Sequence, residues 1–154
     1  GLIAYSRKTV PIAIERFDVA FKIDPSACDA VWMSGLASID LNELAVAAPK
    51  FTRGMTCFTS TAAALRRDLA NTEAAIEKRN SPATAREQRN MDRLRRDAEN
   101  AGEKSAQSAF NGAQCYARTG NKSLALNLVD VAIAHPKMKE KAEAMKAAIE
   151  KLPN

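Results

Sequence analysis

Apolar residues recur at every third or fourth position along most of this chain, and that spacing places them on one face of an α-helix. Near the start, Ala13, Phe17 and Ala20 follow this spacing. The pair Asp24 and Pro25 then ends the pattern, because a proline disfavours helical geometry in the residue before it. The sequence therefore predicts a first helix that stops near residue 24.

Similar patterns predict further helices, with capping residues and prolines at their ends. Asp40, with Glu43 three residues later, resembles a capping box that opens a short helix. Pro49 is expected to end or redirect that helix. Three other helices are expected over residues 27–38, 122–134 and 137–152. The last is amphipathic with a lysine-rich outer side, which is typical of a terminal cap.

The middle of the chain carries a longer pattern, in which the spacing alternates between four and three residues as in a heptad seam. The first seam consists of Phe51, Met55, Phe58, Ala62, Leu65, Leu69, Thr72 and Ile76. Residues 79–82 interrupt it, with Ser81 placed as a helix cap and Pro82 as the first helical residue. The return seam consists of Met91, Leu94, Ala98, Ala101, Ser105, Ser108 and Gly112. Two seams joined by a short loop predict a long antiparallel helical hairpin.

Two stretches resemble the tetratricopeptide repeat (TPR), a helix-turn-helix unit in which small and large residues alternate where the helices pack. The first stretch, residues 1–25, matches the family pattern in Gly1, Ala13, Phe17, Ala20, Asp24 and Pro25. The second, residues 109–136, matches it in Tyr116, Gly120, Ala125, Val129 and Ala132. The resemblance implies an all-α fold of helix-turn-helix repeats, a TPR-like α-solenoid that is partly irregular.

The expected organisation is a single helical-repeat domain over residues 1–154. Its parts are a truncated repeat at 1–25, an irregular repeat at 26–50, the inserted hairpin at 51–107, a second repeat at 108–136 and a capping helix at 137–152.

The resemblance also implies a function, because stacked repeats of this family bind a peptide or helix on their concave face. The first helix of each pair would line that groove, through Leu2, Tyr5, Trp32, Leu36, Phe110, Gln114 and Arg118. An alternative is that Trp32 and Phe110 belong to the core, where large aromatic side chains are usually buried. These positions lack the lysines and asparagines with which some family members grip a terminal carboxylate. We therefore expect a protein-binding scaffold or adaptor with a largely apolar groove.

The net charge of +5 is concentrated in the hairpin: residues 50–96 carry eleven basic and five acidic side chains, and the rest carries twelve and thirteen. Four arginines repeat by three and four residues on the outward side of the return helix: Arg86, Arg89, Arg93 and Arg96. This basic stripe would suit a nucleic acid or an anionic membrane surface. The alternative is a solvated face with i,i+4 pairs, namely Asp92–Arg96, Arg93–Asp97 and Arg95–Glu99.

Residues with catalytic or metal-binding chemistry are few. The cysteines Cys28, Cys57 and Cys115 show no metal-ligand spacing and are expected to be small buried thiols. A pair of Cys115 with His135 is conceivable, but no third residue is placed to orient it. We expect no catalytic, cofactor or metal site, and no enzyme.

No apolar run approaches the roughly 20 residues that a membrane span requires, so we expect no transmembrane segment. Because the sequence starts at Gly1, a mature or trimmed product is consistent with it, and the compartment stays open: cytoplasmic, or periplasmic or secreted if a signal peptide was removed. A structural subunit of a larger assembly is a further possible role.

Overall fold

The computed structural model describes residues 9–153, and they form six helices with no strand among them. The helices are α1 (Val10–Ile23), α2 (Cys28–Asp40), α3 (Leu44–Arg79), α4 (Ala85–Arg118), α5 (Lys122–Ile133) and α6 (Lys139–Glu150). The all-α prediction is therefore confirmed. Leu2 and Tyr5, which we expected in the groove, lie outside the described residues.

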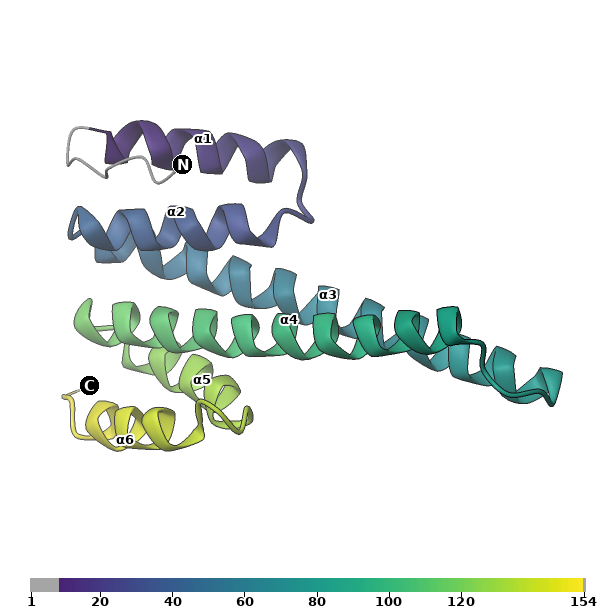
Figure 1. The fold of residues 1–154 in the computed structure, drawn as a ribbon. Helices are drawn as coiled ribbons and strands as arrows, with labels where there is room; N and C mark the ends of the chain where they lie inside the picture. The colour runs from purple at the N-terminus through teal and green to yellow at the C-terminus, as the bar shows by residue number, and fades with distance from the viewer. Residues whose placement is uncertain (1–8, 154) are drawn as a thin grey trace.

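Each helix packs on the next one in the chain and runs antiparallel to it (Figure 1). The two long helices, α3 and α4, pack along each other, and their far ends project beyond the other four (Figure 1). We call this projecting part of α3 and α4, with the loop that joins them, the arm. The remaining helices are stacked on the other end of the pair, with α1 and α2 on one side and α5 and α6 on the other.

The two seams predicted from the sequence meet between α3 and α4. All seven return-seam residues of α4 are buried: Met91, Leu94, Ala98, Ala101, Ser105, Ser108 and Gly112. Ser108 Oγ donates to the Phe51 carbonyl oxygen at 3.0 Å and Ser105 Oγ to that of Met55 at 3.2 Å. Backbone carbonyl oxygens of α3 thus accept hydrogen bonds from both buried hydroxyl groups. A larger apolar side chain at either position would push α3 away from α4.

The expected helix break at Pro49 is wrong, because α3 runs continuously from Leu44 to Arg79. Asp40 ends α2, and Glu43 is the N-cap of α3 without a side-chain cap bond. Pro49 lies in the second turn, where it removes one backbone donor. Burial on both sides of it holds the helix together, since Ala47, Ala48 and Phe51 are fully buried.

The predicted start of the return helix is also wrong. Helix α4 begins at Ala85, with Thr84 rather than Ser81 as the N-cap. Thr84 Oγ1 accepts from the Glu87 backbone at 3.2 Å, and Glu87 Oε2 accepts from the Thr84 backbone at 2.8 Å. This reciprocal capping box satisfies two backbone donors at once, so it defines the helix start better than Ser81 and Pro82 could.

Two buried clusters hold the body of the molecule together. One joins α4, α5 and α6 through Ala109, Ala113, Leu128, Val129 and Ile149, among others. The other joins the first turns of α3 to the end of α4 through Ala47, Ala48, Phe51 and Cys115. Helix α4 contributes to both clusters, so it is the central element of the fold.

Candidate interaction surface

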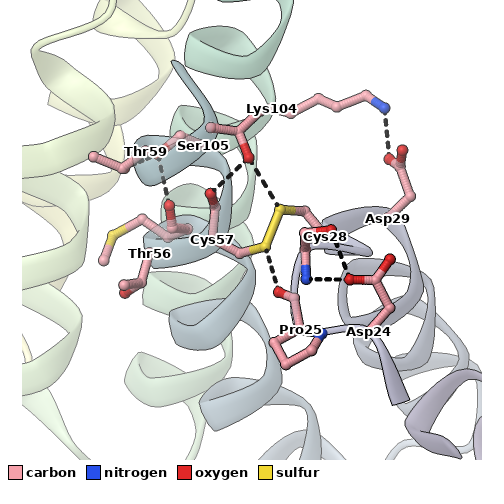
Figure 2. Close-up of a disulfide and its surroundings, with 12 residues drawn as sticks. Asp24, Pro25, Cys28, Asp29, Thr56, Cys57, Thr59, Lys104 and Ser105 are labelled. Carbon is pink, nitrogen blue, oxygen red and sulfur yellow. Dashed lines mark hydrogen bonds and ion pairs between the residues drawn. A yellow bond between two sulfur atoms is a disulfide. The ribbon is translucent and has the colours of Figure 1, made fainter. Parts of the chain in front are cut away.

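Helix α4 has neighbours on three of its sides, namely α3, the α5–α6 pair and α2, which it meets through an ion pair. Its seam faces α3, and Ala109 and Ala113 face the α5–α6 cluster. On the side of α2, Lys104 Nζ pairs with Asp29 at 2.5 Å (Figure 2). On the side of α6, Glu103 pairs with Lys137 at 2.5 Å in the loop before that helix. The fourth side of α4 lies between α2 and α6, and none of the described elements packs on it.

The predicted groove residues do not all share this open side. Trp32 and Leu36 of α2 pack on the cluster around Phe51, and Phe110 packs on the α5–α6 cluster. All three are half-buried, whereas Gln114 and Arg118 are exposed. The two aromatic side chains therefore serve mainly as core, at the edges of the surface between α2 and α6.

Polar residues that the sequence analysis missed occupy this open side of α4. Asn100, Gln107 and Asn111 precede Gln114 and Arg118 at intervals of seven, four, three and four residues. With about 3.6 residues per turn, such intervals keep side chains on one side of a helix. Their spacing continues the spacing of the four arginines beyond Arg96, so the sequence pattern itself indicates them.

The basic stripe lies exposed on the arm: Arg86, Arg89, Arg93 and Arg96 are all exposed. The three i,i+4 pairs expected as the alternative are not among the ion pairs of the described residues. Arg95 instead pairs with Glu73 of α3 at 2.6 Å and with Asp92 at 3.2 Å. Arg93 donates to the side-chain oxygen of Asn90 at 2.9 Å.

Cys28 and Cys57 form a disulfide between the start of α2 and the middle of α3, with their Cα atoms 5.5 Å apart (Figure 2). The expectation of three buried thiols is therefore wrong for this pair and correct for Cys115, which is free and buried. The Pro25 carbonyl oxygen lies 3.3 Å from the Cys57 sulfur. The turn between α1 and α2 thus contacts the disulfide directly.

The Asp24 carboxylate shapes that turn. It accepts hydrogen bonds from the Ser26 hydroxyl at 2.6 Å and from the Ser26 backbone at 2.9 Å. These bonds favour the ionised form and lower the pKa of Asp24. On either side of the disulfide the surface is hollowed, by about 680 Å³ beside Cys57 and about 440 Å³ beside Cys28.

A serine, a lysine and an aspartate meet where α1, α2 and α3 pack. Lys50 Nζ donates to Ser34 Oγ at 2.6 Å and to Asp18 Oδ2 at 3.0 Å, and Ser34 Oγ donates to Asp18 Oδ1 at 2.6 Å. A serine beside a lysine is an arrangement that some hydrolases use. Here Ser34 is completely buried, so a substrate cannot reach its oxygen. The cluster therefore joins three helices and is not a nucleophilic site.

The conceivable pair of Cys115 and His135 does not form. His135 lines a surface hollow with Gly102 and Ser105 of α4, on either side of Glu103 in the chain. Cys115 is twelve residues further along α4, which is about 18 Å of helix. Burial raises the pKa of the Cys115 thiol, so it stays neutral and weakly reactive.

Within residues 9–153, no group of three or more histidine, cysteine or acidic side chains is arranged to hold a metal ion. In the same part of the chain, no helix has both the length and the apolar character of a membrane span. Comparisons of this chain with models of protein families, with curated proteins and with solved structures found no match.

Proposed function

We propose that this chain is a protein-interaction scaffold with TPR-like helical repeats, and that it holds a helix or extended segment of a partner along the open side of α4. One observation carries the proposal. The side of α4 between α2 and α6 presents exposed Gln114 and Arg118, with half-buried Gln107 and Asn111, and none of the described elements covers it. The proposal includes no catalytic step, cofactor or metal.

Two features support a binding role for this side. Its amide side chains offer both donors and acceptors, which suit the polar groups of a partner backbone or side chains. The half-buried Trp32 and Leu36 of the flanking helix α2, together with Phe110 of α4, add partly exposed apolar area. Aromatic residues are enriched in protein interfaces, so the partly exposed rings are suited to contact with a partner.

The proposal is tested by a pull-down from source lysate with the intact, oxidised chain and a blocked variant. Gln114→Trp places a large ring on the open side of α4. Asn127→Trp, at an exposed position of α5, is the matched control. A partner retained at moderate salt by the wild type and by Asn127→Trp, but lost with Gln114→Trp, supports the proposal. Equal retention by both variants contradicts it.

A structural role in a larger assembly is the second candidate, and the outer face of α1 favours it. Ile12, Val19 and Ile23 are 51%, 49% and 78% exposed, and their spacing places them on one side of the helix. An exposed apolar stripe of this kind is typical of a contact surface. If the chain assembles through α1, light scattering will show a mass above that of a monomer, and Val19→Glu with Ile23→Glu will restore the monomer.

A further inference from the structure

The basic stripe on the arm and the open side of α4 in the body are one continuous surface. Arg96 is followed by Asn100 after four residues, and the same rotational position recurs at Gln107, Asn111, Gln114 and Arg118. We call this surface the α4 line, from Arg86 to Arg118. It extends for about 48 Å, with arginines on the arm and mostly uncharged amides between α2 and α6.

The arginines of the α4 line are available to a partner. Among the described residues, Arg86, Arg89 and Arg96 take part in no ion pair, and Arg93 has only an amide partner. Arg95, which points away from the line, is the arginine that pairs with Glu73 and Asp92. Among the described residues, the arm therefore carries four guanidinium groups that form no ion pair, along about 15 Å of helix.

The α4 line changes along its length from arginines to uncharged amides, and this change restricts the class of partner that it can bind. Arginines at intervals of three and four residues match acidic side chains at the same intervals on a second helix, about 5 Å apart along the axis. A nucleic acid would be expected to meet cations along the whole surface and aromatic rings for base stacking. Beyond Arg96 the line consists of Asn100, Gln107, Asn111, Gln114 and Arg118, with no aromatic residue among them.

We infer that the α4 line binds an acidic helix of another protein, whose Asp and Glu residues recur every three or four positions and face Arg86 to Arg96. The uncharged continuation of that helix lies over Gln107, Asn111 and Gln114 between α2 and α6. This inference rests on the proposed scaffold function and specifies the class of partner. It also assigns the arm a role, which is to extend the binding surface beyond the body.

The test uses the intact, oxidised chain and fluorescence anisotropy with three probes. The first is a synthetic helical peptide with glutamates at intervals of three and four residues. The second has the same composition with the glutamates distributed around the helix. The third is a single-stranded oligonucleotide. We expect the first peptide to bind most tightly, and its affinity to fall several-fold between about 50 and 200 mM salt.

Two double charge-reversal variants test whether the first peptide binds at the arginines of the arm. Arg89→Glu with Arg93→Glu should weaken binding of the first peptide by about tenfold or more, because like charges would then face each other. Lys139→Glu with Lys141→Glu on α6 changes the net charge equally and should leave affinity nearly unchanged. Both pairs are exposed, so far-ultraviolet circular dichroism should show full helix content in each variant.

Three outcomes would overturn the inference: equal affinity for the two peptides, tighter binding of the oligonucleotide, or equal losses in the two charge-reversal variants. Its failure is distinguishable from failure of the scaffold function. A lysate partner that is lost with Gln114→Trp but retained by Arg89→Glu with Arg93→Glu would support the scaffold function and contradict the acidic partner helix.

A second inference rests on the cysteines alone. The structure assigns this chain to an oxidising compartment, because disulfides persist there and are reduced in the cytosol. Cys28 and Cys57 are paired, and the leftover thiol of Cys115 is only 1% exposed, so it is protected from mixed disulfides. Acid-quenched source cells, alkylated before and after reduction, test this. Cys28 and Cys57 should be alkylated only after reduction, and alkylation of both without reductant would overturn it.

Discussion

At the scale of single residues, the close approach of the central helices depends on small side chains at a few points. A Cβ atom on Gly112 would lie 2.8 Å from Leu128 Cδ1 and 3.2 Å from Phe51 Cβ. Phe51 is completely buried and cannot move away. Gly112 therefore sets the distance at which α4 packs against both α3 and α5.

Two glycine substitutions in α4 should have opposite effects on stability. Gly112→Ala should lower the free energy of unfolding by about 1 to 2 kcal/mol, because the clash outweighs the gain in helix propensity. At Gly102 a Cβ would meet only Arg66 Nη2 at 3.6 Å, an ordinary contact. Gly102→Ala should therefore raise the free energy of unfolding by about 0.5 to 1 kcal/mol. Urea unfolding measures both, and shifts in the same direction would contradict this packing.

The ionisation of Glu87 makes the stability of the end of the arm depend on pH. Its two carboxylate oxygens accept from Arg79 at 2.8 and 2.9 Å. These bonds, followed by those from Thr84, lower the pKa of Glu87 from 4.5 to about 2. A lowered folded pKa means that ionised Glu87 stabilises the fold above about pH 4.5, and that this stabilisation is lost as the pH falls through about 2.

Glu87→Gln should therefore lower the melting temperature at pH 7, and its difference from the wild type should shrink between pH 4.5 and pH 2. Thermal melts at a series of pH values give this difference, and the NMR titration of the Glu87 carboxyl gives the pKa itself. A difference that is constant down to pH 2, or a titration near 4.5, would contradict the bidentate contact.

At the scale of elements, α1 and α2 are attached to α3 by two different kinds of bond. The disulfide joins the first residue of α2 to α3. Near the middle of α2, Lys50 of α3 bonds to Ser34 and Asp18, and the Lys50 side chain is only 12% exposed. Because these attachments are separated along the helices, they restrain the α1–α2 pair against rotation as well as separation.

Removal of the disulfide should destabilise the fold by about 3 to 4 kcal/mol, because it closes a loop of 29 residues in the unfolded chain. Reduction of the wild type and the double substitution Cys28→Ala with Cys57→Ala should lower the urea midpoint by similar amounts. The double variant is its own control, since reductant should leave its midpoint unchanged. A wild-type midpoint that does not respond to reductant would show that the bond is absent or without effect.

The sequence predicted the helical elements well where periodicity was strong, as along Met91, Leu94 and Ala98, because burial repeats at every turn of a helix. It failed at Pro49, since the burial of Phe51 and its neighbours that keeps α3 continuous is a tertiary effect. It also missed the disulfide. Cys28 and Cys57 come together only because α2 and α3 pack side by side, and spacing along the chain does not reveal that.

At the scale of the whole molecule, α4 links the parts. It belongs to both buried clusters, forms half of the arm and carries the α4 line, which runs from the arm to the space between α2 and α6. The sequence analysis found two pieces of this surface, the arginines and the pair Gln114 and Arg118, and assigned them to alternative functions. Only the continuous helix from Ala85 to Arg118 joins them into one surface.

The central claim is that the α4 line is where this chain meets its partner, and site-specific photo-crosslinking tests it most directly. A benzophenone amino acid is placed at Gln114 in one variant and at Asn127 of α5 in the other, both exposed positions. Irradiation in source lysate should give a discrete higher-mass adduct from position 114 and none from 127. An adduct of equal yield from both positions, or from 127 alone, would contradict the claim.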